Sequence, residues 1–177
     1  AIRIPTVSHQ DPAEDDPAAF QAFREHLEAS YPALHASLRR EIVNERSLLY
    51  TWPGRDASLP GVVLMAHQDV VPVEPGTEGA WEHPPYSGAV AGGFVWGRGT
   101  LDTKGKLTGL CEAVEVLARE GFQPKRTTYL FFGHDEEVGG RNGAQAMAKR
   151  FETEGKQFDW VLDEGGTIAV GIVPGVE

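Results

Sequence analysis

The segment Val62-Val63-Leu64-Met65-Ala66-His67-Gln68-Asp69 is an apolar run of strand length that ends in a histidine and a carboxylate. Two later apolar runs end in a similar way: Tyr129–Gly133 leads into His134-Asp135-Glu136-Glu137, and Trp160–Leu162 leads into Asp163-Glu164. Open α/β sheets bind ligands beyond the carboxyl ends of their strands. If these strands are parallel neighbours, their terminal imidazole and acidic groups are expected to meet at one edge of a sheet.

Outward from these runs, short apolar strands alternate with helices, which predicts an α/β fold with a central, mostly parallel or mixed sheet flanked by helices. The expected strands are Ser47–Trp52, Val62–Ala66, Thr128–Gly133 and Trp160–Leu162, and the expected helices are Pro17–Ser30, Lys104–Glu120 and Gly143–Phe151. Gly121 supplies a left-handed stop to the helix from Lys104. Thr127–Phe132 and Trp160–Leu162 are interpreted as buried strands, and Pro72–Gly93 as an ordered surface loop.

The length, charge and residue content of the chain limit the classes of protein and of binding partner that it fits. A chain of 177 residues is long enough for one packed domain, and 16 Lys and Arg against 26 Asp and Glu give a net charge of -10. This charge disfavours a nucleic acid partner. We find no apolar run of membrane-spanning length and no signal-peptide pattern, so we expect no membrane partner. The compartment is not settled by the sequence, with the cytoplasm favoured. The single cysteine, Cys111, is expected to be a buried structural thiol.

The residue types at the strand ends fit metal chemistry. A single His-x-Asp or Glu-Glu pair is usually a solvated turn, so each pair alone is weak evidence. A carboxylate-bridged pair of divalent ions requires a shared carboxylate, a mixture of imidazole and carboxylate ligands, and a further acid that handles protons. The three strand ends, together with Asp102 before the helix from Lys104, contain all of these groups.

Five stretches make the pattern specific. They are Ala66-His67-Gln68-Asp69-Val70-Val71-Pro72-Val73, Trp81 to Gly88, Trp96-Gly97-Arg98-Gly99-Thr100-Leu101-Asp102-Thr103-Lys104-Gly105, Gly133-His134-Asp135-Glu136-Glu137 and Leu162-Asp163-Glu164-Gly165-Gly166. In order and spacing, this series resembles the M20 family of metallopeptidases and N-acyl amino acid hydrolases. Within that family it is most similar to the carboxypeptidase S and N-fatty-acyl amino acid hydrolase branch. The resemblance implies a zinc-exopeptidase-like catalytic domain.

The resemblance also implies roles for individual residues. The implied metal ligands are His67, Asp102, Glu137 and Glu164, with His67 and Glu164 on one zinc ion, Asp102 bridging two, and Glu137 on the second. Two zinc ions are expected in the full-length enzyme, with another divalent ion as the alternative. Asp69 is expected to hold the His67 ring, and Glu136 to be the general base for a metal-bridging water that attacks an amide or peptide bond. A cis peptide bond is expected at Asp102–Thr103.

The domain organisation follows from the same resemblance. Residues 1–177 are expected to be the N-terminal part of the metal-binding catalytic domain, without the lid or dimerisation domain and without the returning segment that carries a last histidine. The fragment alone is therefore expected to be inactive, and the stretch Thr167 to Val173 is interpreted as hairpin-like. The expected substrates are peptides or N-acyl amino acids, and the full-length enzyme is a candidate homodimer. The alternative is a non-catalytic metal-binding or interaction domain, which the intact Glu136 disfavours.

Overall fold

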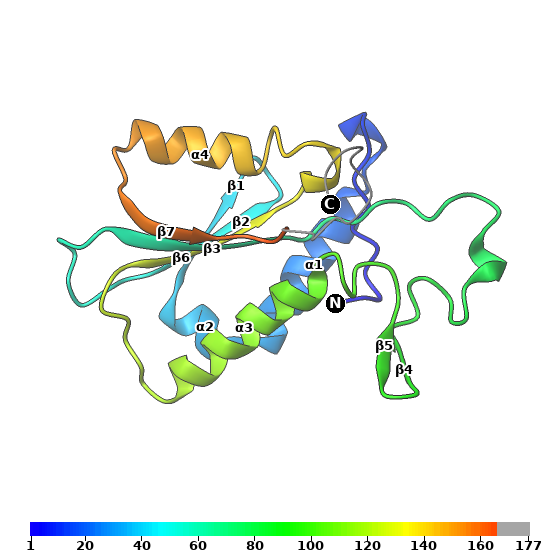
Figure 1. Ribbon diagram of the computed structural model, residues 1–177, viewed down its shortest axis with the longest axis horizontal. Helices are drawn as coiled ribbons and strands as arrows, with labels where there is room; N and C mark the ends of the chain where they lie inside the picture. The colour runs from blue at the N-terminus through cyan, green and yellow to red at the C-terminus, as the bar shows by residue number, and fades with distance from the viewer. Residues whose placement is uncertain (166–177) are drawn as a thin grey trace, which may run out of the picture.

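The core of the molecule is a five-stranded sheet, seen in a computed structural model that describes residues 1–165 (Figure 1). In spatial order the strands are β1 (Arg39–Val43), β2 (Ser47–Trp52), β6 (Thr128–Gly133), β3 (Gly61–His67) and β7 (Phe158–Leu162). β1 and β2 pair in antiparallel fashion, as do β2 and β6. β3 lies parallel to both β6 and β7. The predicted mixed α/β sheet is confirmed.

The parallel arrangement of β6, β3 and β7 brings three strand ends to one edge of the sheet. His67 is in register with Gly133, and Leu64 is in register with Leu162. The residues that follow these strands therefore leave the sheet side by side. The condition on which the sequence argument depended, three parallel neighbours, is met.

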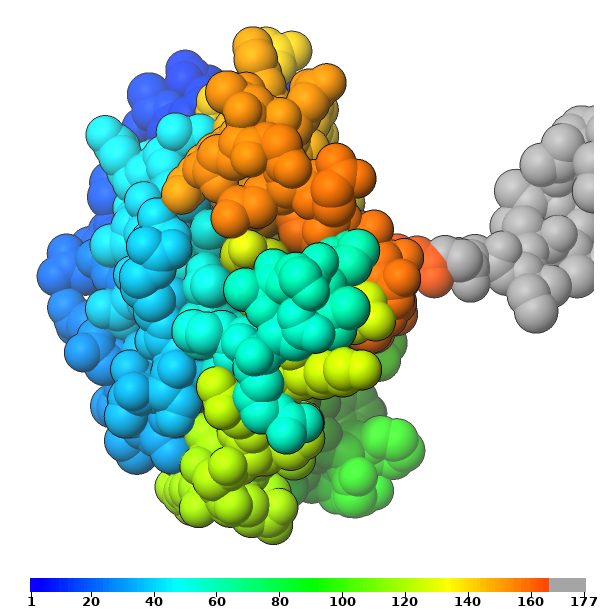
Figure 2. All heavy atoms as spheres, turned by 90° about the vertical axis from the view of Figure 1, so that its left-hand side faces the viewer, coloured from blue at the N-terminus to red at the C-terminus, as the bar shows by residue number. Residues whose placement is uncertain are grey.

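Helices cover both faces of the sheet (Figure 1). One face carries α1 (Pro17–Ser30), α2 (Pro32–Ser37) and α3 (Lys104–Arg119), and the other carries α4 (Ala144–Thr153). Figure 2 views the sheet from the end where β3 begins, with α4 and β7 in orange well separated from the end of α3 in yellow-green. The Asp16 side chain accepts a hydrogen bond from the Ala18 N–H, which caps α1 as its Asp-Pro start predicts. None of the helices within residues 1–165 has the length and apolar character that crossing a bilayer demands.

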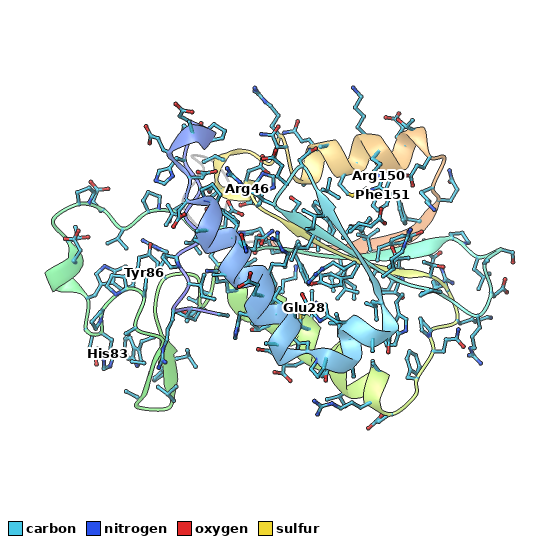
Figure 3. The ribbon with its side chains drawn as sticks, turned by 180° about the vertical axis from the view of Figure 1, so that it is seen from behind. Glu28, Arg46, His83, Tyr86, Arg150 and Phe151 are labelled. Carbon is cyan, nitrogen blue, oxygen red and sulfur yellow. The ribbon has the colours of Figure 1, made fainter. Side chains whose placement is uncertain are left out.

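Strand β6 shows how the alternation of side chains builds two cores. Leu130 and Phe132 point into the cluster beneath α1, α2 and α3, whereas Tyr129 and Phe131 point into the cluster beneath α4. Phe151 of α4 belongs to the second cluster (Figure 3). Because both faces of β6 are buried, the strand is a continuous apolar run and was readily predicted.

Several short elements were not predicted. They are α2, β1, the hairpin of β4 (Ala89–Ala91) and β5 (Phe94–Trp96), and the 3₁₀ turns η1 (Pro12–Glu14), η2 (Glu78–Ala80) and η3 (Glu136–Val138). Strands of three residues show too few alternations to be recognised by period. The segment predicted as a surface loop, Pro72–Gly93, therefore contains η2 and β4 within an otherwise irregular path.

The prediction that Trp160–Leu162 is a buried strand was wrong about burial. The strand exists, as part of β7, but Trp160, Val161 and Leu162 are 48%, 53% and 50% exposed. Among the described residues β7 pairs only with β3, which makes it an edge strand. An apolar run shows that a strand is suited to apolar contacts. It does not show whether the strand lies at the edge or in the centre of the sheet. The stretch Thr167 to Val173 lies outside the described residues.

Candidate metal centre

His67 is the last residue of β3, and its side chain is the centre of the candidate site. The residue is 1% exposed, and the Nδ1 atom lies 2.9 Å from the backbone carbonyl oxygen of Asp69. Because a carbonyl oxygen only accepts, Nδ1 carries the hydrogen of this bond. In the neutral ring, the Nε2 lone pair is then free to bind a metal ion.

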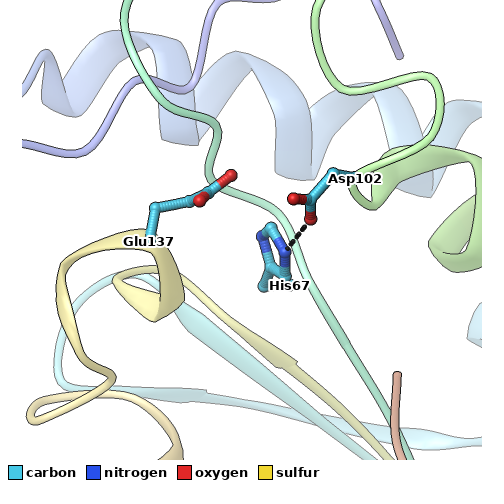
Figure 4. Close-up of side chains that lie close together, drawn as sticks. All are labelled: His67, Asp102 and Glu137. Carbon is cyan, nitrogen blue, oxygen red and sulfur yellow. Dashed lines mark hydrogen bonds and ion pairs between the residues drawn. The ribbon is translucent and has the colours of Figure 1, made fainter. Parts of the chain in front are cut away.

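Carboxylates surround the Nε2 atom of His67. The Asp102 Oδ1 atom lies at 2.9 Å, the Glu164 Oε1 atom at 3.0 Å and the Glu136 Oε2 atom at 3.7 Å. Figure 4 shows His67 with Asp102 and Glu137 on either side of it. Asp102 comes from the loop before α3, and Glu164 follows β7. The sheet edge thus gathers side chains from segments that are far apart in the sequence.

Ligand atoms of these residues fall into two overlapping groups, in each of which every atom lies within 4.8 Å of the others. One group is His67, Asp102 and Glu137, and the other is His67, Glu136 and Glu164. The turn η3 makes this possible, because it presents Glu136 and Glu137 to the same region where an extended segment would send them to opposite sides. The structure therefore brings all four sequence-predicted ligands, and Glu136, around His67.

Asp69 connects the site to its surroundings. The ring N–H of His67 goes to the backbone carbonyl of Asp69, while the carboxylate Oδ1 lies 3.3 Å from the same Nδ1 atom. The other carboxylate oxygen, Oδ2, accepts hydrogen bonds from the Ser8 hydroxyl at 2.7 Å and from the Glu137 backbone N–H at 3.1 Å. Asp69 therefore accepts the His67 ring N–H through its backbone carbonyl rather than its carboxylate, and the carboxylate anchors the turn that carries Glu137.

The local electrostatics are those of crowded negative charge. Burial raises the pKa of Glu137 to about 7, and the neighbouring Asp102 carboxylate adds to this effect. Burial also raises the pKa of Glu136, helped by Glu164. Burial alone would lower the pKa of His67, but Asp69, Glu164 and Asp102 outweigh it and raise the pKa to about 10. The cluster therefore attracts positive charge.

The donor set fits zinc. Zinc in proteins binds imidazole nitrogen and carboxylate oxygen with bonds of about 2.0–2.2 Å, so ligand atoms in a tetrahedral site lie about 3.3 Å apart. The oxygens of Asp102 and Glu164, at 2.9 and 3.0 Å from the His67 Nε2 atom, need to move outward by only a few tenths of an ångström to reach about that spacing. The peptide bond between Asp102 and Thr103 is cis, as the family resemblance led us to expect.

Comparison with known proteins identifies the family. Residues 63–176, more than half of the chain, match the family described as peptidase family M20/M25/M40. The chain belongs to this peptidase family. The match spans all five of the stretches on which the resemblance rests, and it begins within β3.

Three curated relatives are similar to most of this M20 chain. Carboxypeptidase S from Saccharomyces cerevisiae is 43% identical over 93% of the chain and 30% of its own length. An N-fatty-acyl-amino acid synthase/hydrolase from Mus musculus is 40% identical over 100% of the chain and 35% of its own length. A probable carboxypeptidase S-like protein from Dictyostelium discoideum is 44% identical over 82% of the chain and 28% of its own length. The chain spans about a third of the length of the curated relatives it matches.

Solved structures support the fold. An M20 family metallo-carboxypeptidase from Sulfolobus solfataricus has a TM-score of 0.70 and 20% identity, over 93% of this chain and 35% of that one. Human carnosine dipeptidase 1 has the same TM-score and identity, over 90% of this chain and 35% of that one. At this identity the likeness establishes the M20 catalytic-domain architecture.

His134 and Asp135 lie next to the M20 site and hold neighbouring segments in place. The Nδ1 atom of His134 lies 2.6 Å from the Ser47 hydroxyl oxygen on β2. The Asp135 carboxylate accepts hydrogen bonds from the backbone N–H groups of Asn142 and Gly143, which fixes the loop after η3. Neither residue belongs to the two ligand groups found among the described residues.

Arg98 and the histidines His26, His35 and His83 lie outside the two ligand groups of the described residues. His26 and His35 are half-buried, and the His35 Nε2 atom lies 3.1 Å from the Tyr50 hydroxyl. The contact of His35 with Tyr50 on β2 cannot be identified from the helical pattern around His35 alone. His83 lies in the loop Pro72–Gly93, which projects from the rest of the molecule (Figure 3). The Arg98 guanidinium stacks 5.2 Å above the Trp81 ring.

Sequence reasoning missed Ser8, whose hydroxyl contacts the Asp69 carboxylate. The residue lies in the short mixed segment at the start of the chain, and the two partners are 61 positions apart. No local motif marks a serine of this kind. Only the path of the folded chain identifies it.

Proposed function

We propose that the whole protein hydrolyses an amide or peptide bond with two zinc ions held by this chain. The observation that carries the proposal is the ring of carboxylates around the free Nε2 face of His67, in a chain of peptidase family M20/M25/M40. His67, Asp102 and Glu164 would hold the first ion, and Asp102 and Glu137 would hold the second. Residues 1–177 are, in this proposal, part of the metal-binding catalytic domain.

The net charge of the carboxylate cluster is balanced better by two divalent ions than by one. Five carboxylates lie in or against the cluster: Asp69, Asp102, Glu136, Glu137 and Glu164. With all five ionised and His67 neutral, their charge is -5. One divalent ion leaves -3, and two leave -1, which nearly neutralises a partly buried site. Unpaired like charges at such distances are costly, because burial weakens their screening by water.

Within this site Glu136 is the proton carrier. When bound, zinc lowers the pKa of a water molecule and polarises the substrate carbonyl. Glu136 accepts the proton of the attacking water and returns it to the leaving amine nitrogen. Its carboxylate lies 3.7 Å from the His67 Nε2 atom and is half exposed, so it faces both the ligand cluster and entering substrate. Its raised pKa brings it nearer to the working pH, which favours proton exchange in both directions.

The substrate class is proposed from the surface beside the cluster. A hollow of about 460 Å³ is lined by Asp102 and Glu137 and by the apolar side chains of Trp81, Trp96 and Leu101. Such a hollow suits an apolar group next to the bond that is cut. The names of the relatives, carboxypeptidase S and N-fatty-acyl-amino acid synthase/hydrolase, agree with peptides and N-acyl amino acids as substrates.

The affinity for zinc is expected to rise with pH. With no ion bound, His67 has a pKa raised to about 10 and Glu137 a pKa raised to about 7, so both release protons when zinc binds near neutral pH. Each displaced proton steepens the pH dependence by about tenfold per unit. We therefore expect the zinc affinity to rise about tenfold per pH unit above the pKa of Glu137. Below that pKa the affinity is expected to fall more steeply as the pH falls. Calorimetric titration in buffers of different ionisation enthalpy measures the protons released, and a pH-independent affinity contradicts this assignment of ligands.

The function is tested by zinc content and turnover measured together. The whole protein is expected to bind about two zinc ions per chain and to release amino acids from N-acetyl or N-fatty-acyl amino acids or from peptides. Chelation is expected to abolish turnover, and zinc to restore it. Two bound ions without turnover on any of these substrates would support a non-catalytic metal-binding domain instead.

The 177-residue chain alone provides a second comparison. We expect it to bind the first ion more tightly than the second, because His67 serves the first and only carboxylates serve the second. We also expect it to hydrolyse little, because it spans only about a third of the length of the curated relatives it matches. Two equally tight ions with turnover equal to that of the whole protein would refute both expectations.

A further inference from the structure

The segment Ile4–Ser8 runs alongside the loop that follows His67. Val7 forms a parallel bridge with Val70, in which the Val70 N–H donates to the Thr6 carbonyl and the Ser8 N–H donates to the Val70 carbonyl, at 3.0 and 3.3 Å. The Thr6 hydroxyl donates to the Gln68 carbonyl at 2.5 Å. Thr6 and Ser8 are almost completely buried. The segment is therefore fixed along its length to the loop that carries Asp69.

The Ser8 side chain continues these contacts into the site. Its hydroxyl donates to Asp69 Oδ2 at 2.7 Å, and the same oxygen accepts the Glu137 backbone N–H at 3.1 Å. Asp69 is fully buried, and its other oxygen lies 3.3 Å from the His67 Nδ1 atom. One carboxylate thus joins Ser8, the imidazole and the turn that bears Glu136 and Glu137.

The other end of the segment contacts the helix that follows Asp102. The Lys104 Nζ atom donates to the Ile4 carbonyl at 2.6 Å, and Lys104 is 1% exposed. Its ammonium also lies 4.9 Å above the Phe23 ring of α1. Since Lys104 begins α3 only two residues after Asp102, the segment is tied to the loop that supplies this carboxylate as well.

We propose that the segment Ile4–Ser8 is a strap that sets the geometry of the candidate zinc centre, with Ser8 as a positioning residue acting through Asp69 on His67 and Glu137. The proposal rests on the proposed function and adds a determinant outside the matched residues 63–176. Ser8 does not touch the ion or the substrate. It determines which way the Asp69 carboxylate faces, and Asp69 in turn holds a ligand on each side.

The physical reason is the burial of Asp69. A fully buried carboxylate needs hydrogen-bond donors for both oxygens, and Asp69 Oδ1 has no hydrogen bond of good geometry among the described residues. Loss of the Ser8 hydroxyl leaves the Glu137 N–H as the main donor to the other oxygen. The carboxylate then rotates toward whichever donors remain, which moves the imidazole and the turn apart. Second-layer partners of this kind change metal affinity by about tenfold to a hundredfold.

The test compares Ser8→Ala, Ser8→Thr and Thr51→Val with the wild type. Ser8→Thr keeps the hydroxyl. Thr51→Val removes a hydroxyl from β2 that has no hydrogen-bond partner among the described residues, so it is a matched control for loss of an oxygen. Zinc affinity is measured by competition with a chromophoric chelator, and ligand geometry by the visible absorption of bound Co²⁺. Thermal unfolding with the metal removed reports stability separately.

We expect Ser8→Ala to weaken zinc binding by about tenfold and to change the Co²⁺ spectrum, with Ser8→Thr restoring both and Thr51→Val changing neither. Zinc affinity and a Co²⁺ spectrum equal to those of the wild type in Ser8→Ala overturn the proposal. So does an affinity loss in Ser8→Thr as large as that in Ser8→Ala, since the hydroxyl is then not the cause. If the wild type itself binds no zinc, the proposed function fails first and this proposal with it.

Discussion

Replacing Glu136 by glutamine is expected to lower the kcat of the whole protein by about a hundredfold to ten-thousandfold, the usual contribution of a general base. Glutamine has the size of glutamate and still forms hydrogen bonds, but it cannot accept the proton of the attacking water. Because Glu136 is not among the four proposed ligands, zinc stoichiometry should remain at two ions per chain. Steady-state hydrolysis of an N-acyl amino acid, with metal analysis of the same sample, provides both measurements.

Glu137→Gln is the matched control, because the two residues are adjacent in the turn η3 and carry the same functional group. We expect this change to remove the second ion, so that activity is recovered in part when zinc is added in excess. Glu136→Gln should show no such recovery. The alternative is present in the structure, since Glu136 shares a potential ligand group with His67 and Glu164. If Glu136→Gln loses a zinc ion, Glu136 is a ligand and the proton carrier must be sought elsewhere.

The central strands could be predicted because a strand that is buried on both faces has an apolar sequence along its length. β6 is covered on both faces, and its run Tyr129–Gly133 is apolar without interruption. The same rule failed for β7, whose run Trp160–Leu162 is also apolar but lies at the edge of the sheet among the described residues. The residue composition of a strand indicates whether the strand is suited to an apolar environment. Which neighbouring element packs against it depends on the whole fold.

The candidate site was predictable to the extent that it depends on strand ends. His67, Glu137 and Glu164 each follow a recognisable strand, and parallel pairing brings them together. Asp102 lies on a loop, and only the family resemblance connects it with the others. Ser8 could not be found at all, because its contact with Asp69 depends on where an irregular segment crosses the loop after β3. Local sequence patterns therefore identify the metal ligands more readily than the residues that orient those ligands.

Replacing His67 by alanine is expected to weaken zinc binding by more than a hundredfold. Structural zinc sites with four ligands bind with apparent free energies of about 10–16 kcal/mol at neutral pH, so one ligand contributes roughly 3 kcal/mol, or a factor of more than a hundred. His67 is the member shared by both ligand groups of the described residues, and it supplies nitrogen where the rest supply oxygen. Chelator competition measures the affinity, and His83→Ala, in the projecting loop, is the control for loss of an imidazole (Figure 3).

The result also separates two readings of the acidic cluster. A carboxylate-rich site without an essential imidazole favours hard cations such as Mg²⁺ or Ca²⁺, which bind oxygen. If zinc affinity in His67→Ala stays within about threefold of the wild type, the carboxylates alone hold the ion and the assignment of His67 is wrong. A loss confined to zinc, with Mg²⁺ binding unchanged, shows instead that the nitrogen of His67 gives the cluster its preference for zinc.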